Sequence, residues 1–165
     1  MHEALVDYLP TAKLDGVIFS AAWNTEDAAP LKATLAYAKR FVPRVIILGN
    51  IPTHDIALPD LLGRSLIKHR PDLILKNQSP YPQQVDQLFK TMIDRANYVS
   101  LVDLLCPENR CIVYAAPNVP LQFDTSHLTT EGSILVAKKL TKLPIFATRD
   151  DGRDQGSPQT KAPPK

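Results

Sequence analysis

Four consecutive apolar residues, Val45-Ile46-Ile47-Leu48, constrain the fold of this chain more than any other feature. The run lies between Pro43 and the turn formers Gly49-Asn50 and Pro52, which gives it the length of a strand rather than that of a helix. A strand that is apolar at every position is covered on both faces, as the strands of a parallel sheet are. We therefore predict a buried parallel strand over residues 45–48.

Strand and helix patterns alternate along the rest of the chain. Further strands are predicted at residues 17–20 and 98–101 and in a short segment at 112–114, and helices at 4–9, 31–42, 60–69, 83–96 and 129–140. This alternation favours an α/β fold with a mostly parallel sheet. Right-handed crossovers place the carboxyl ends of parallel strands at one edge, where loops usually form the site. Ser20–Asn24 and Gly49–Asn50 follow such strand ends.

Composition indicates a folded domain and excludes several classes of function. Hydrophobic residues make up 44% and charged residues 22% of the chain, which a wholly disordered protein would not have. The net charge is only +2 and the basic residues are scattered, so we expect no nucleic-acid partner. No apolar run approaches the ~18 residues of a membrane span, and the first residues do not resemble a secretion signal. Beyond Pro144 polar residues dominate, so we expect one domain over residues 1–143 and a disordered tail over 144–165.

Two cysteines, Cys106 and Cys111, stand five positions apart. The spacing alone permits three interpretations. They could be reduced thiols in a loop, part of a metal site that recruits two further ligands, or a local disulfide in an oxidising compartment. Zinc ligand pairs usually stand two to four residues apart, which makes the metal site the weakest of the three.

The segment from Phe123 to Gly132 carries the sharpest chemical pattern. Asp124 and His127 stand three apart directly before a predicted helix, so the carboxylate can hold the imidazole in one tautomer and stabilise its charged form. Thr129 suits the N-cap of that helix, and Gly132 permits close packing in its first turn. The same spacing also fits an aspartate that caps a turn beside a surface histidine.

This segment, Asp124-x-x-His127-Leu128-Thr129-x-x-Gly132-Ser133, resembles the last motif block of SGNH hydrolases, and in particular of SGNH domains fused to membrane acyltransferase-3 proteins. Residues 17–23 are similar to the strand that ends in Ala-x-Trp in those domains, and residues 45–52 to the next strand with its Gly-x-x-Pro exit. The likeness extends from about Asp15 to Leu140. It implies a three-layer α/β sandwich (SGNH or flavodoxin-like), and a disulfide between Cys106 and Cys111.

The resemblance also implies a function. The intact domain would act as an esterase or O-acetyltransferase that moves an acyl group, chiefly acetyl, to or from a sugar hydroxyl of a cell-envelope polysaccharide. His127 would transfer the proton, Asp124 would orient His127, and the Trp23–Asn24 turn would line the pocket or help to hold the oxyanion. No metal or organic cofactor is implied. The implied partners are an acyl-bearing carbohydrate and an upstream membrane acyltransferase domain, on the periplasmic or extracytoplasmic face of a bacterial membrane.

The chain departs from the family pattern at the nucleophile. Gly-Asp-Ser does not occur, and Gly16 follows Asp15 in the reverse order. Ser20 and Ser126 lie within other motif blocks, whereas a working serine meets its base from a separate strand-end turn. We therefore expect the C-terminal part of an SGNH domain, N-terminally truncated, inactive alone, and with an exposed sheet edge that favours self-association.

Two other functions remain open at this point. The first is a non-catalytic carbohydrate-binding or interaction module derived from an SGNH domain. The second is a small nucleotide-binding α/β domain, which is weak because none of the six glycines forms Gly-x-Gly.

Overall fold

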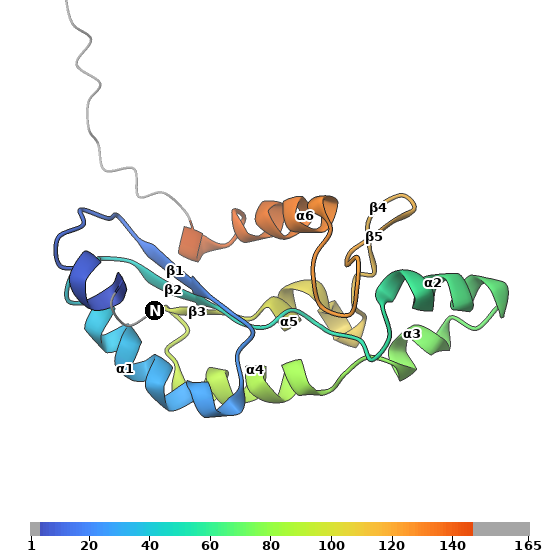
Figure 1. Cartoon of the computed structure of the whole chain (residues 1–165), viewed down its shortest axis with the longest axis horizontal. Helices are drawn as coiled ribbons and strands as arrows, with labels where there is room; N and C mark the ends of the chain where they lie inside the picture. Colours follow the sequence, from blue (N-terminus) through green and yellow to red (C-terminus); the bar gives the residue numbers. More distant parts are fainter. Residues whose placement is uncertain (1–3, 147–165) are drawn as a thin grey trace, which may run out of the picture.

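The computed structural model describes residues 4–146, and its centre is a three-stranded parallel sheet (Figure 1). The strands are β1 (Val17–Ser20), β2 (Val45–Leu48) and β3 (Tyr98–Val99), in the order β1-β2-β3. Val17 is in register with Val45, and Ile47 with Tyr98. Within the described residues β1 pairs with β2 alone, so its other edge is open.

Helices cover both faces of this sheet and give three layers. Helices α1 (Ala28–Ala38) and α4 (Tyr81–Met92) lie on one side, and α6 (Thr130–Leu140) lies on the other (Figure 1). The remaining elements are α2 (Leu58–Ile67), α3 (Asp72–Lys76), α5 (Leu101–Leu105), the hairpin β4 (Tyr114–Ala116) and β5 (Val119–Pro120), a π-helix (Ala4–Tyr8), and 3-10 helices Thr25–Asp27, Pro107–Asn109 and Pro144–Phe146. The predicted α/β fold with a parallel sheet is confirmed.

The two faces of the sheet bury separate hydrophobic clusters. Val45 and Ile47 point into the cluster formed with α1 and α4, which includes Phe89. Ile46, from the same strand, packs into the opposite cluster with Val136 of α6. Alternate side chains of β2 therefore fill different cores, which explains why the strand is apolar throughout.

Several predicted boundaries differ from the observed ones. Helix α4 occupies residues 81–92 rather than 83–96; Pro82 is tolerated in its first turn, and the helix ends at Ile93, whose backbone is extended. The strand predicted at 98–101 stops at Val99, because the hydroxyl of Ser100 accepts from the N–H of Asp103 and caps the unpredicted helix α5. The segment predicted at 112–114 contributes only its last residue to β4. Helix α3 was also not predicted.

Residue 49, directly after β2, must be a glycine because Tyr98 of β3 comes very close to its backbone. A Cβ at this position would collide with the hydroxyl of Tyr98. That hydroxyl donates to the buried carboxylate of Asp86 on α4 at 2.7 Å, and Lys90 makes an ion pair with the same carboxylate. Burial, together with this carboxylate, raises the pKa of the Tyr98 phenol. The contact ties α4 to the edge of the sheet where β2 ends.

The chain remains ordered a little beyond the predicted domain boundary at residue 143. Residues 144–146 form a 3-10 helix that packs on the α6 side, and the guanidinium of Arg44 donates to the carbonyl of Ile145 at 2.6 Å. Three residues of the predicted tail are thus part of the fold, and the rest of it, 147–165, lies outside the described residues. Between residues 4 and 146, no helix is both long and apolar enough to cross a membrane.

Candidate active site

The Asp124–His127 pair lies at the tip of a tight turn that leads into α6. Two backbone hydrogen bonds connect the two arms of this turn. Thr129 N–H donates to Leu121 O, and Phe123 N–H donates to His127 O, each at 3.0 Å. Gln122 and Leu128 form a β-bridge between these two bonds. The turn is therefore a short hairpin that holds residues 124–126 at its end.

The two side chains predicted to act together are in contact. Oδ2 of Asp124 lies 2.7 Å from Nδ1 of His127, while Oδ1 accepts from the backbone N–H groups of Ser126 at 2.8 Å and His127 at 2.7 Å. The Ser126 N–H above all, and then the His127 N–H, lower the pKa of the Asp124 carboxyl to about 2. Asp124 is thus ionised at neutral pH and can only accept, so the Nδ1 of His127 is its donor.

The other imidazole nitrogen is available for proton transfer. With Nδ1 carrying the proton, the Nε2 of His127 presents a lone pair, and among residues 4–146 no protein group occupies it. The His127 side chain is 70% exposed. The Phe123 ring lies nearly parallel to the imidazole, with 5.7 Å between the ring centroids. The arrangement suits a general base that acts on a hydroxyl approaching from outside.

The start of α6 fixes this turn from the C-terminal side. The hydroxyl of Thr129 accepts from Gly132 N–H at 3.0 Å, as expected of an N-cap, and donates to Pro120 O at 2.9 Å. A Cβ on Gly132 would collide with the carbonyl oxygen of Leu121. The predicted cap and the predicted close packing at Gly132 are both confirmed.

A buried histidine, His54, bonds to the turn that carries Asp124 and His127. This role was not predicted from the sequence. His54 is 5% exposed; its backbone N–H donates to Thr125 O at 3.0 Å, and its Nδ1 lies 3.2 Å from Oε1 of the buried Gln122. Burial lowers the pKa of the His54 imidazole, so it is neutral and donates through Nδ1. Leu58 N–H also donates to Asp124 O. A histidine after a turn proline carries no sequence signal for this role.

Trp23 and Asn24 form a second cluster, where β1 and β2 end. The Trp23 indole N–H donates to Leu48 O, and the Asn50 amide bonds both to the N–H and to the C=O of Trp23, all at 2.8 Å. The backbone N–H of Asn24 donates to the Asp27 carboxylate. Both backbone N–H groups of the predicted Trp23–Asn24 turn are therefore already engaged.

Residues 50–58 connect the two clusters. Asn50 bonds to Trp23, and four residues later His54 bonds to the turn that carries Asp124 and His127. The structure thus brings Asp124 and His127 into direct contact and places Trp23 and Asn24 at the neighbouring strand ends. Ser126 Oγ lies 3.5 Å from Nδ1 of His127, the nitrogen that Asp124 holds. Ser20 ends β1 with an exposed side chain.

Cys106 and Cys111 are joined by a disulfide, which decides between the three interpretations left open by their spacing. The metal-site and free-thiol interpretations are wrong, because both sulfurs are used in the bond. Elsewhere in residues 4–146, no cluster of histidine, cysteine and carboxylate side chains is arranged to hold a metal ion.

Comparisons with known proteins identify the family and the fold. Residues 1–142 match the model of the SGNH domain that is fused to AT3 domains. Among solved structures, the periplasmic domain of the lipopolysaccharide acetyltransferase of Salmonella ser. Paratyphi A is similar in fold, with a TM-score of 0.64 and 22% sequence identity. The likeness covers 76% of this chain and 55% of that domain, so this chain spans just over half of its length. No curated protein gave a match. Since the family model covers most of the chain, the protein belongs to the family of SGNH domains found fused to AT3 domains.

Proposed function

We propose that this chain supplies the acid–base half of an O-acyltransferase or esterase site, which transfers acetyl groups to or from sugar hydroxyls of a cell-envelope polysaccharide in the periplasm. The observation that carries the proposal is the 2.7 Å contact between Asp124 and His127, with the opposite nitrogen open. Two findings support it: the family is one of SGNH domains fused to AT3 domains, and the similar solved domain comes from a periplasmic acetyltransferase.

In the proposed reaction, His127 Nε2 removes the proton from a serine hydroxyl as that oxygen attacks the acyl carbonyl. Asp124 stabilises the imidazolium that forms, and His127 then returns the proton to the leaving alkoxide. Ser126 does not fit the role of nucleophile, because its hydroxyl is near Nδ1 and not Nε2. We propose that the serine belongs to a Gly-Asp-Ser strand outside residues 4–146, which would pair along the open edge of β1.

The Asn24 side chain is the best candidate in this chain to stabilise the oxyanion. Tyr81 donates its hydroxyl to Asn24 Oδ1 at 3.2 Å, so the amide oxygen is engaged from the side of α4. The NH₂ group has no protein acceptor among the described residues and is the part that could donate to a developing negative charge. The backbone N–H groups of Trp23 and Asn24 would have to break existing bonds to do the same.

An ester-hydrolysis assay tests the proposal in two arms. The chain alone, given p-nitrophenyl acetate or acetylated xylan, is expected to show no turnover above that of its His127→Ala variant. Turnover that His127→Ala abolishes would place the nucleophile within this chain. In a longer polypeptide that includes a Gly-Asp-Ser strand, His127→Ala is expected to reduce kcat by roughly 10⁶-fold and Asp124→Asn by roughly 10⁴-fold. Ser126→Ala is the matched control and should retain activity; full activity of His127→Ala would refute the proposal.

A further inference from the structure

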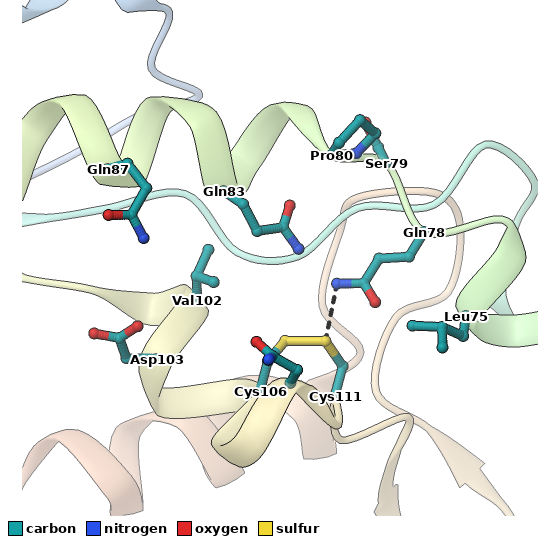
Figure 2. A pocket seen from close by; sticks show the side chains of 11 residues that line it. Leu75, Gln78, Ser79, Pro80, Gln83, Gln87, Val102, Asp103, Cys106 and Cys111 are labelled. Carbon is teal, nitrogen blue, oxygen red and sulfur yellow. Dashed lines mark hydrogen bonds between the residues drawn. A yellow bond between two sulfur atoms is a disulfide. The ribbon is translucent and has the colours of Figure 1, made fainter.

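A cavity of about 340 Å³ lies between the start of α4 and the disulfide loop (Figure 2). It is separate from the Asp124–His127 turn, and no step of the proposed reaction uses it. Its polar wall consists of three glutamines, one asparagine, one serine and one aspartate: Gln78, Ser79, Gln83, Gln87, Asp103 and Asn109.

The charge of this wall restricts what the cavity can bind. No lysine or arginine lines it, and both oxygens of the Asp103 carboxylate contact Lys90, at 2.7 and 2.8 Å. A phosphate or carboxylate ligand would face amides and a carboxylate with no lining cation to neutralise it. Each glutamine amide, by contrast, offers both donors and an acceptor, the combination that pairs with hydroxyl groups. The lining thus favours a neutral ligand rich in hydroxyls.

The amides on the α4 side are held in place before any ligand binds. Gln78 Nε2 lies 3.0 Å from Sγ of Cys111 and points across the cavity to the disulfide (Figure 2). The side-chain oxygen of Gln83 faces Gln78 and accepts from its Nε2 at 2.7 Å. The Gln83 NH₂ group donates to Ser79 O at 2.9 Å. A preorganised wall costs less conformational entropy on binding.

Other amides remain available for a ligand. Neither Gln87 nor Asn109 uses its side-chain amide in a hydrogen bond to another described residue. Gln87 projects from α4 toward Val102 and Asp103 across the cavity (Figure 2). The disulfide fixes the opposite wall, because Cys106 and Cys111 both line the space.

Backbone hydrogen bonds link the cavity wall to the catalytic turn. Ser79 N–H donates to Thr53 O at 2.9 Å, and His54 forms a bridge with Gln78. On its other side, His54 N–H donates to Thr125 O. Gln78 and Thr125 are thus two strand spacings apart, about 10 Å, a distance that a short oligosaccharide spans.

We infer that this cavity is a binding subsite for a neutral sugar unit of the carbohydrate on which the enzyme acts. The inference extends the proposed function to a specific place in the fold, and it rests on that function for the identity of the larger substrate. The amides of Gln87 and Asn109 would bind the hydroxyl groups of this sugar, while Gln78, Gln83 and the disulfide form the rigid wall behind them.

Amide NMR spectra of the isolated chain provide the test. The chain is titrated with methyl glycosides of glucose, galactose and mannose, and separately with glucuronate and inorganic phosphate. We expect at least one neutral glycoside to shift the side-chain amide signals of Gln78, Gln83 and Gln87, with a Kd in the millimolar range. Gln87→Leu is expected to weaken this binding by about three- to tenfold, as the loss of one or two neutral hydrogen bonds would.

Gln84→Leu is the matched control, since Gln84 is an exposed glutamine on the same helix that does not line the cavity. It should bind the glycoside as the unmodified chain does. The inference fails if no neutral glycoside shifts these signals, if Gln87→Leu and Gln84→Leu bind equally well, or if phosphate or glucuronate shifts them more strongly.

The outcome is separable from that of the proposed function. His127→Ala is expected to leave glycoside binding unchanged, because His127 does not line the cavity. Binding of a glycoside by a chain whose longer form shows no acyl transfer would support the subsite and refute the proposed reaction. Acyl transfer whose kcat and KM are both unaffected by Gln87→Leu would support the proposed reaction and refute the subsite.

Discussion

The Asp124 carboxylate bonds to His127 twice, through the imidazole Nδ1 and through the backbone N–H, both at 2.7 Å. One residue thus sets the tautomer of the imidazole and the conformation of the turn that carries it. The two side chains are partly exposed, so these bonds hold the pair itself, while the backbone N–H groups of His54 and Leu58 hold the turn that carries it.

The tautomer of His127 should depend on Asp124. In the unmodified chain, ¹⁵N NMR of the imidazole is expected to show the neutral ring protonated at Nδ1. Asp124→Asn replaces an obligate acceptor by an amide that can also donate, so a mixture of tautomers is expected. Ser126→Ala keeps the carboxylate and should preserve the Nδ1–H form; a protonated Nε2 in the unmodified chain would contradict the proposed role.

Two glycines on helices should respond to alanine in opposite directions. Gly132→Ala forces a Cβ against the Leu121 carbonyl, which the backbone cannot easily move, so we expect a loss of about 1–3 kcal/mol. Gly63→Ala, inside α2 with open space around it, should gain about 0.5–1 kcal/mol from helix propensity. Thermal unfolding measures both, at roughly 2–4 °C per kcal/mol for a chain of this size. Equal shifts in the unfolding temperature of the two variants would show that the Leu121 carbonyl does not exclude a Cβ at position 132.

Stability should fall on mild acidification because of His54. Its folded-state pKa lies below the ordinary value of 6.5, so below that pH the unfolded chain binds more protons than the folded one. The free energy of unfolding is therefore expected to decrease as the pH drops through and below 6.5, measured by urea denaturation. His54→Gln should flatten this dependence, whereas His69→Asn, at an exposed histidine, should not. Asp124 contributes to stability in a more acidic range. The stabilisation of the folded chain by its ionised carboxylate is lost as the pH falls from 3.8 toward about 2.

Reduction of the disulfide should destabilise the chain modestly. Cys106 and Cys111 close a loop with a sequence separation of only 5, for which the chain-entropy relation gives about 2 kcal/mol. Denaturation with and without dithiothreitol measures the difference, with a Cys106→Ser/Cys111→Ser variant as the control that reductant should not affect. A loss well above this value would mean that the disulfide also maintains native packing, for example of the cavity wall that Cys111 forms with Gln78.

The open edge of β1 should promote association of the isolated chain. Within the described fold β1 pairs only with β2, and Ile18 on it is 53% exposed. Exposed apolar edge strands pair with other chains, and a lysine on such a strand opposes this. Size-exclusion chromatography is expected to show concentration-dependent oligomers that Ile18→Lys reduces. Ile134→Lys, at an exposed isoleucine of α6, is the control; a monomer at all concentrations would contradict the prediction.

The sequence by itself determined the parts of this protein that follow from local patterns. The apolar run 45–48 predicted a strand covered on both faces, and the observed β2 has those bounds. The spacing of Thr129 and Gly132 predicted an N-cap and a close approach, and that of Asp124 and His127 permitted a paired carboxylate and imidazole, which the family resemblance then favoured over a turn-capping aspartate. All of these contacts are set by residues within one turn and one helix start. Short-range geometry of this kind is encoded by spacing.

Only the tertiary structure decided which distant groups meet. The burial of His54 against Gln122, the bonds of Asn50 that occupy Trp23, and the amide-lined cavity between α4 and the disulfide loop each join segments far apart in the chain. No local pattern marks His54, Gln78 or Gln122 as special, because a polar side chain acquires its role from the groups packed around it. Packing of α4 and residues 50–58 against the sheet supplies those neighbours.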